Sequence, residues 1–328
     1  MDIIEILKER IMVLDGAMGT MIQKYSLSES DFRGRRFASH PYKIKGCNDI
    51  LNLTQPSIIS QIHAEYLSAG ADIIETNTFN AQSVSLSDYG LETYAYEINH
   101  EAARLARAAA DEYFERDPMW YRFVAGCIGP TNRSASVPQD VNNPNFRFIS
   151  YDELVNKYAV QIEGLMDGRV DMLLVETVFD ILNAMAALDA ISQVFEKKKR
   201  HLPVMVSVTI SNESGCLLSG QNIEKFLVSV SHFSPLSVGI NCSPGALQMK
   251  PFVEMIAAKA PYFVSIYPGA GLPDQSGEHK ETAEQMAAIV EKYMSEGLVN
   301  IAGGCCGTTP EYITLLAQKA RKYKPRKF

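Results

Sequence analysis

The sequence lacks the features that mark membrane-spanning, secreted and nucleic-acid-binding proteins. No apolar stretch reaches the roughly 18 residues that a membrane span needs. The N-terminus has no basic flank, long apolar stretch or small-residue cleavage site, so it does not resemble a signal peptide. The 31 Lys and Arg residues are outnumbered by 38 Asp and Glu, a formal net charge of -7, whereas nucleic-acid binding needs clustered cations. We expect a cytoplasmic protein without membrane or nucleic-acid partners.

Cysteine is also scarce, and nothing in the chain marks a boundary between domains. Six cysteines in 328 residues do not make a disulfide scaffold and indicate a reducing compartment. Because no linker, charge block or low-complexity tract divides the chain, we predict one domain over 1–328. Residues 320–328 are expected to form a basic C-terminal tail or the start of a linker.

What the chain does have is a regular alternation of short apolar runs with longer segments of helical periodicity. Continuous apolar runs are typical of parallel strands that are covered on both faces. Eight fairly even units favour a closed (β/α)8 TIM barrel over an open doubly wound sheet. The expected strands are 11–16, 71–79, 122–130, 170–178, 204–211, 237–243, 262–269 and 299–304.

Two connections are much longer than the others and point to one end of the barrel. They are the enlarged loops after the first and third strands, residues 24–55 and 131–150. Both follow the carboxyl ends of strands, where barrel enzymes build their active sites. Polar side chains also stand at the strand ends, and this ring is the signal for a site: Asp15, Glu75, Asn77, Thr78, Glu176, Thr177, Asn241, Cys242, Cys305 and Cys306.

Three of the cysteines fall at this same end of the barrel. Cys242 ends one expected strand, and Cys305 and Cys306 follow the last one. Three thiolates with a fourth position open are typical of catalytic zinc. Spacing alone leaves an equal alternative, in which the three are packed core cysteines.

The other candidate ligands are weaker. Cys47 in a loop, Cys127 inside a strand and Cys216 in a turn are interpreted as free thiols without a role. The six histidines show no paired metal-binding spacing, so none is assigned to the metal.

Several segments together resemble one family, the homocysteine S-methyltransferases. They are "VLDGAMGTMIQ", "GADIIETNTF", "VDMLLVETVFD", "GINCS" and "EGLVNIAGGCCGTTP", and the resemblance spans nearly the whole chain. Within the family the chain is most similar to the N-terminal homocysteine-binding module of cobalamin-dependent methionine synthases. The "FRG" at 32–34, the "ND" at 48–49 and the "SDYG" at 87–90 support that branch.

The resemblance implies zinc-dependent transfer of a methyl group to the thiol of homocysteine, which gives methionine. It implies one zinc ion per chain, held by Cys242, Cys305 and Cys306, which act in catalysis through the metal. The implied donor is methylcobalamin on a separate module or protein, with 5-methyltetrahydrofolate as the ultimate donor. We therefore expect cobalamin-binding and folate-binding partners, and no cobalamin bound stably by this chain.

Two alternatives to this function stay open. One is a self-sufficient methyltransferase that uses S-methylmethionine or betaine, and the other is a non-catalytic zinc-binding scaffold. The acids Asp15 and Glu176, at the ends of the first and fourth expected strands, count against the scaffold. The implied reaction needs a metal, because a free thiol with a pKa of about 8.5 is mostly protonated at neutral pH. Zinc keeps such a sulfur as a thiolate. Three cysteine ligands leave the zinc site at a net charge of about -1, so the metal withdraws little electron density from the homocysteine sulfur, which can still attack a methyl group.

The amino-acid end of homocysteine needs partners as well. The resemblance implies that Asp15 and Glu176 bind its ammonium, and the backbone N–H groups of Gly16, Ala17 and Met18 are expected to cradle its carboxylate. The alternative for Asp15 is a helix cap, and for Glu176 it is a structural ion pair with a loop arginine.

The roles of the remaining strand-end residues are less defined. Thr78 is predicted as a further substrate contact. Glu75 and Asn77 are expected either to lie behind the substrate-binding residues or to cap helices. At Gly269 the methionine synthase branch is expected to have an asparagine that fills the fourth zinc position. Because Gly269 has no side chain, we predict that water or a small molecule takes that position, with Tyr267 as a phenolic candidate. Alternatively, Gly269 only eases the turn through a positive φ.

Overall fold

The computed structural model describes residues 2–137, 147–210, 215–242, 245–271 and 281–328. In this part of the chain, eight parallel strands pair in the order β1-β8-β7-β6-β5-β4-β3-β2. A parallel bridge between Leu14 and Ile73 brings the two ends of the sheet together, so the predicted (β/α)8 barrel is confirmed. The strands are β1 Met12–Val13, β2 Ile73–Glu75, β3 Phe123–Ile128, β4 Met172–Val178, β5 Val204–Val208, β6 Ser237–Cys242, β7 Phe263–Pro268 and β8 Ile301–Ala302.

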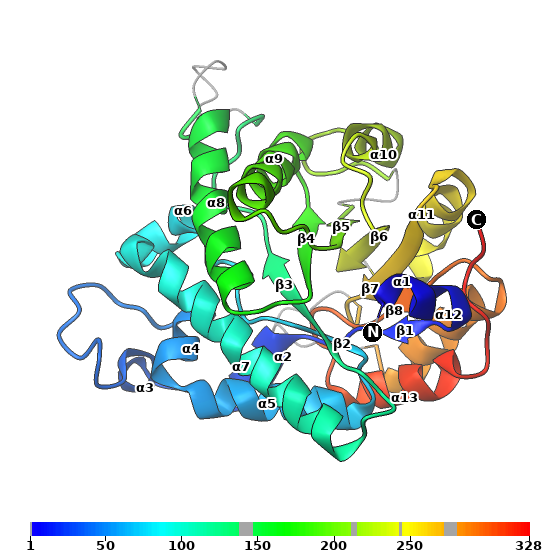
Figure 1. Cartoon of the computed structure of the whole chain (residues 1–328), viewed down its shortest axis with the longest axis horizontal. Coiled ribbons are helices and arrows are strands. Elements are labelled where there is room, and N and C mark those ends of the chain that lie inside the picture. The colour runs from blue at the N-terminus through cyan, green and yellow to red at the C-terminus, as the bar shows by residue number, and fades with distance from the viewer. Residues whose placement is uncertain (1, 138–146, 211–214, 243–244, 272–280) are drawn as a thin grey trace.

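Helices surround these strands, and their colours follow the chain around the barrel (Figure 1). The main outer helices are α5 Pro56–Ala69, α7 Ala95–Arg116, α8 Tyr151–Asp167, α9 Ile181–Lys198, α10 Ile223–Ser231, α11 Ala246–Lys259, α12 Ala283–Ser295 and α13 Pro310–Ala320. The shorter elements are α1 Ile3–Glu9, α2 Met18–Gln23, α3 Glu29–Arg33, η1 Asn48–Ile50, α4 Leu51–Thr54, α6 Ser83–Leu86, η2 Ser87–Tyr89 and η3 Glu92–Tyr94. No helix in the described ranges is both long and apolar enough to cross a membrane.

Local sequence explains where several helices begin. At α8, Ser150 accepts a hydrogen bond from the Glu153 amide, and the Glu153 side chain accepts from the Ser150 amide. Thr282 and Gln285 form the same reciprocal capping box at α12. Helix α5 instead begins with Pro56, whose fixed φ suits the first turn.

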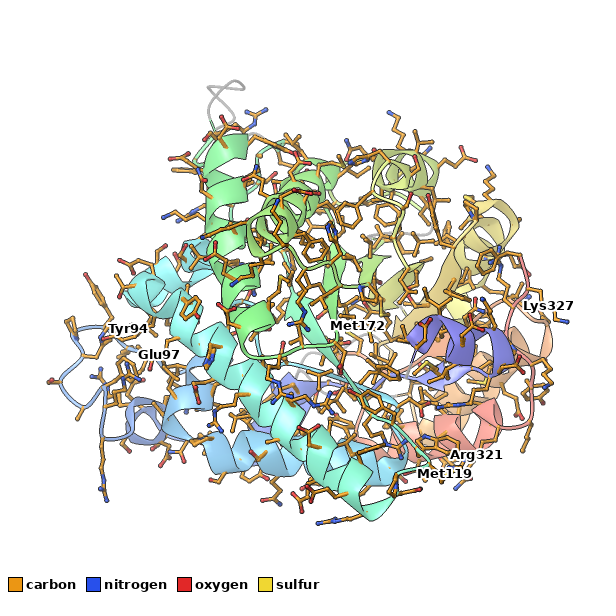
Figure 2. All side chains as sticks on the ribbon, in the orientation of Figure 1. Tyr94, Glu97, Met119, Met172, Arg321 and Lys327 are labelled. Carbon is orange, nitrogen blue, oxygen red and sulfur yellow. The ribbon has the colours of Figure 1, made fainter. Side chains whose placement is uncertain are left out.

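The core has two layers, as a barrel requires. The larger layer lies between strands and helices, and the smaller fills the barrel interior. Met172, labelled near the centre of Figure 2, belongs to the interior layer. The other buried residues of this layer are Ile3, Leu7, Met12, Leu14, Ile73, Phe123, Ala125, Leu174, Met205, Phe263, Tyr267 and Ile301. Because Ile3 and Leu7 come from α1, this helix closes the N-terminal end of the barrel.

Most expected strands end earlier than the apolar runs that predicted them. The run 71–79 yields only β2, because the chain turns after Glu75: the Thr78 amide donates to the Thr76 carbonyl at 2.8 Å. The run 299–304 yields the two residues of β8, after which two glycines lead into the paired cysteines. Some polar residues therefore end the strands themselves, as Glu75 ends β2 and Cys242 ends β6, whereas Asn77, Thr78, Cys305 and Cys306 stand on the turns that follow.

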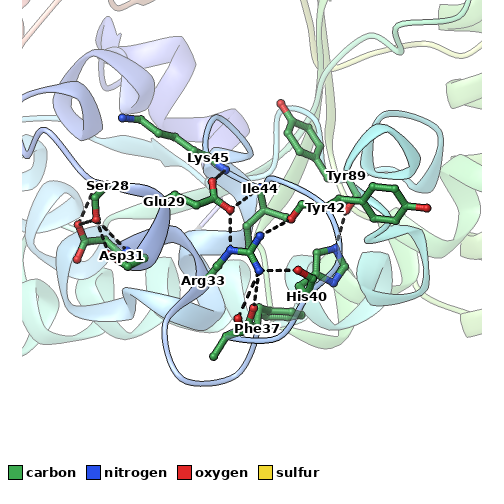
Figure 3. A network of polar contacts seen from close by, with 12 residues as sticks. Ser28, Glu29, Asp31, Arg33, Phe37, His40, Tyr42, Ile44, Lys45 and Tyr89 are labelled. Atoms are coloured by element: carbon green, nitrogen blue, oxygen red, sulfur yellow. Dashed lines mark hydrogen bonds and ion pairs between the residues drawn. The ribbon is translucent and has the colours of Figure 1, made fainter.

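An arginine organises the enlarged loop after β1. The Arg33 guanidinium donates to Glu29 at 2.7 Å and to the backbone carbonyls of His40 and Tyr42 at 2.5 and 2.7 Å (Figure 3). Glu29 in turn accepts from the amides of Ile44 and Lys45, and the Ile44 hydrogen bond lowers the pKa of its carboxyl. The enlarged loop after β3 is described only in part, because 138–146 lie outside the described residues.

The C-terminal residues are attached to the N-terminal face of the barrel. Arg326 is 7% exposed and donates to the carbonyls of Ala257, Ala260 and Tyr262 at 2.6 to 3.0 Å. Its own carbonyl accepts from Asn300 at 2.9 Å. The tail at 320–328 is thus attached to the barrel through Arg326. That the tail also begins a linker stays a prediction.

Arg326→Ala should lower the free energy of unfolding by about 2–4 kcal/mol, because buried carbonyls lose a charged donor. Arg104→Ala is the control, since Arg104 forms only a surface ion pair with Glu101 and should cost less than about 1 kcal/mol. Chemical denaturation of the two variants measures both effects. Equal losses would show that the Arg326 contacts contribute no more than a surface pair.

Candidate metal centre and substrate pocket

The structure brings the three predicted thiols together at the carboxyl ends of the strands. The sulfur atoms of Cys242, Cys305 and Cys306 all lie within 4.8 Å of one another, and those of Cys242 and Cys306 are 3.6 Å apart. Two sulfurs at 2.3 Å from a tetrahedral zinc would be about 3.8 Å apart. The donor set and its spacing therefore fit zinc.

The chain that follows β7 holds the two cysteine segments in place. The Gly269 amide donates to the Cys242 carbonyl at 3.0 Å, and the Ala270 amide donates to the Cys306 carbonyl at 2.8 Å. In the other direction, the Cys305 amide donates to the Pro268 carbonyl at 2.8 Å. Three backbone hydrogen bonds thus set the distance between the end of β6 and the turn after β8.

Without a cation the thiols of Cys242 and Cys305 resist ionisation, because both have a raised pKa. Hydrogen bonds from Cys242 and Cys306, together with burial, raise the pKa of the Cys305 thiol well above its usual value. For Cys242, the hydrogen bond with Cys305 lowers the pKa, but the Cys306 thiol and burial outweigh it and raise the pKa to about 12. A cluster that holds three thiolates at neutral pH therefore needs a positive partner, which a bound metal ion would supply.

Asn241 links this cluster to the neighbouring strands. Its amide oxygen accepts from the Thr177 amide at 3.0 Å and the Ser207 hydroxyl at 2.8 Å. Its amide nitrogen donates to Glu176 at 3.2 Å and lies 3.8 Å from the Cys305 sulfur. Thr177 has a φ of 55°, in the left-handed region, so the Asn241 contacts also hold a strained turn at the end of β4.

Beside the thiols lies a buried group of three carboxyls. Asp15 and Glu176 are 3% and 5% exposed, and Glu75 connects them, because its amide donates to Asp15 at 3.0 Å and its carboxyl hydrogen-bonds to Glu176. Burial raises the pKa of all three. Among the described residues, Oδ1 of Asp15 has no hydrogen-bond partner. A buried acceptor without a partner indicates that a donor from a ligand belongs there.

Neither structural alternative for these acids is correct within the described part of the chain. Helix α2 is capped by Ala17 without a side-chain hydrogen bond, so Asp15 does not cap it. The partners of Glu176 are the Cys127 thiol, the Asn241 amide, the Thr177 hydroxyl and the Glu75 carboxyl rather than an arginine.

The turn predicted to cradle a carboxylate packs tightly against the turn after β8. A Cβ on Gly16 would lie 2.8 Å from the Thr308 hydroxyl and 2.9 Å from the Tyr66 ring, so only glycine fits. The Tyr66 hydroxyl donates to the carbonyls of Ala17 and Thr308, and the Ala17 amide donates to the Thr308 hydroxyl at 3.3 Å. Helix α2 then begins at Met18. This packing places residues 16–18 next to the segment that carries Cys305 and Cys306.

Thr78 and Tyr267 lie deeper than a substrate contact or a metal ligand usually does. Thr78 is fully buried, and its hydroxyl donates to the Cys127 carbonyl at 2.6 Å. Tyr267 is 1% exposed and belongs to the interior layer, where burial and the charges of Glu176 and Glu75 raise the pKa of its phenol well above the usual value. The roles predicted for Thr78 and Tyr267 stay predictions.

Gly269 lies directly against the thiol cluster. A Cβ there would be 3.2 Å from the Cys306 carbonyl oxygen and 3.5 Å from that of Cys242. Its φ is not in the positive region, so the interpretation that glycine eases a left-handed turn is wrong. Close approach to the cysteine backbone is the constraint that the structure shows at this position.

Sequence reasoning missed Cys127. Its sulfur donates to Oε1 of Glu176 at 2.8 Å, a contact that the interpretation of Cys127 as a free thiol without a role did not include. The signal was present in the strand: Phe123 and Ala125 face the barrel interior, and side chains alternate along a strand. That alternation places Cys127 on the same inner face, at the end where the site lies.

Comparisons with known proteins concern the family and the fold of the chain. A sequence model of the homocysteine S-methyltransferase family matches residues 12–320. Among solved structures, the homocysteine methyltransferase MmuM from Escherichia coli in its metallated form is 20% identical, with a TM-score of 0.75, covering 96% of this chain and 98% of that one. Its oxidised form is 21% identical, with a TM-score of 0.71 and coverage of 95% and 96%.

At this level of identity the structural match shows a shared fold, whereas the family match extends over nearly the whole chain. The protein therefore belongs to the homocysteine S-methyltransferase family.

Proposed function

We propose that this protein transfers a methyl group to the thiol of homocysteine with the help of one zinc ion per chain, giving methionine. The observation that carries the proposal is that three thiols lie within 4.8 Å of one another, beside the carboxyls of Asp15, Glu75 and Glu176. Cys242, Cys305 and Cys306 would hold the metal, which when bound would keep the homocysteine sulfur as a thiolate.

The chain's own residues would orient the substrate. The Asp15 oxygen without a partner and the Glu176 carboxylate offer acceptors for the α-ammonium. The amides of residues 16–18 would donate to the α-carboxylate, and the Ala17 amide would exchange its hydrogen bond with the Thr308 hydroxyl for one with the substrate. Thr78, whose hydroxyl donates to the Cys127 carbonyl at 2.6 Å, stays a proposed further contact of the substrate. An amino acid held at both charged ends would present its thiol to the three cysteines with little freedom.

The methyl donor that we propose is methylcobalamin, bound by a separate module or protein and supplied in turn from 5-methyltetrahydrofolate. Support comes from the similarity of residues 32–34, 48–49 and 87–90 to the methionine synthase branch. Residues 32–34 belong to the loop that Arg33 organises, so this part of the similarity lies on an ordered segment. Homocysteine and cobalamin-binding and folate-binding modules are therefore the proposed partners.

Cys305→Ala should reduce bound zinc from about one ion per chain to a small fraction and abolish methyl transfer, because two thiols and no third protein ligand hold zinc weakly. Cys47→Ala is the matched control, since Cys47 is a buried thiol that does not belong to the cluster. Metal analysis by plasma mass spectrometry after dialysis measures the difference. Full zinc occupancy in a variant with alanine at all three cluster positions would contradict the assignment.

The donor can be identified by offering homocysteine with free methylcobalamin, S-methylmethionine or betaine in turn. Slow methionine formation is expected with methylcobalamin alone, because no residue of this chain is proposed to orient the corrinoid, and a cobalamin-binding protein should accelerate it greatly. Robust turnover with S-methylmethionine or betaine and none with methylcobalamin would place the protein among the self-sufficient methyltransferases. No turnover with any donor would favour the scaffold alternative.

A further inference from the structure

We propose that Cys127 is a positioning residue, whose thiol holds the Glu176 carboxylate in the orientation that receives the α-ammonium of the substrate. This inference rests on the proposed function, because it concerns how the same pocket selects an amino acid. It adds a fourth cysteine to the site, one that acts on the substrate end rather than on the metal.

The position of Cys127 supports such a role. It lies near the carboxyl end of β3 and is 2% exposed, so its thiol is screened from water. Its sulfur is 2.8 Å from Oε1 of Glu176. Asn241 and Thr177 both donate to the other oxygen, Oε2, at 3.2 and 3.4 Å. Both oxygens of the Glu176 carboxylate therefore accept hydrogen bonds, and Cys127 supplies the one at Oε1.

The contact between Cys127 and Glu176 affects which of two neighbouring carboxyls, Glu75 or Glu176, carries the negative charge. Its carboxyl hydrogen-bonds to Glu176, and two carboxyls in such contact share a proton. A donor aimed at Glu176 favours the negative charge on Glu176 rather than on Glu75, and the hydrogen bond from Cys127 lowers the pKa of Glu176 against the effect of burial. An ammonium ion binds the ionised carboxylate, so the thiol, together with Asn241 and Thr177, directs the ammonium to Glu176 rather than to Glu75.

The same three side chains could also be read as a second metal site, because their ligand atoms lie within 4.8 Å of one another. The geometry favours a hydrogen bond. A sulfur and an oxygen bound to one tetrahedral zinc would be about 3.5 Å apart, whereas the Cys127 and Glu176 atoms are 2.8 Å apart. With no ion between them, the Cys127 thiol donates directly to the carboxylate, which brings the two atoms closer than a shared zinc ion would.

The test compares two ligands that differ only in the ammonium group, homocysteine and 4-mercaptobutyrate, on the zinc-loaded full chain. Isothermal titration calorimetry under reducing conditions gives each affinity. Cys127→Ala should weaken homocysteine binding about tenfold, the effect of one hydrogen bond to a charged group. Binding of 4-mercaptobutyrate should change less than twofold, because this ligand has no ammonium group for Glu176 to bind.

Two further variants separate positioning from packing. Cys127→Ser keeps a donor of similar size and should restore homocysteine affinity to within about threefold of the wild type. Cys47→Ala removes another buried thiol and should leave both affinities unchanged. Thermal unfolding and zinc content of each variant should stay close to those of the wild type.

Several results would overturn the inference alone. They are an equal loss of affinity for both ligands in Cys127→Ala, no loss for either, or a wild type that holds two metal ions where Cys127→Ala holds one. A zinc-loaded wild type that binds neither ligand would instead contradict the proposed function, and the inference would fall with it.

Discussion

The site depends on three backbone hydrogen bonds that join the chain after β7 to the segments on either side of it. Cys242 ends β6, and Cys305 and Cys306 follow β8, so β7 separates them in the sheet. The amides of Gly269 and Ala270 and the carbonyl of Pro268 connect all three cysteines to one short stretch of backbone. A side chain at Gly269 would press on that backbone, so the smallest residue stands where the thiols must converge.

The convergence collects groups that repel one another once they are ionised. Three thiols adjoin the carboxyls of Asp15, Glu75 and Glu176, and burial raises the pKa of each carboxyl. Such a pocket is stabilised by positive charge at two points, the thiol cluster and the carboxyl cluster. A zinc ion and the ammonium of an amino acid meet these two requirements. The site would thus be complementary to a zwitterion that carries a thiol, and Asn241, which contacts both Glu176 and Cys305, connects its two halves.

The sequence allowed the barrel and the convergence of the thiols to be predicted, because both follow from local signals. Continuous apolar runs define parallel strands, and polar residues at their ends define the face that carries the site. Strand lengths were less predictable, since turns after Glu75 and Ala302 depend on backbone hydrogen bonds. The partners of Cys127 and Arg326 were not predictable from pattern, because they join residues 49 and more than 60 positions apart. The constraint on Gly269 likewise comes from the carbonyl of Cys306.

The central claim is that three cysteines hold a zinc ion whose remaining position is open to the homocysteine sulfur. X-ray absorption at the zinc edge, on the zinc-loaded full chain before and after homocysteine is added, tests it most directly. The account predicts three sulfur neighbours at about 2.3 Å and one oxygen or nitrogen in the resting protein, and four sulfurs after addition. A sulfur count that stays unchanged while homocysteine is bound would contradict it.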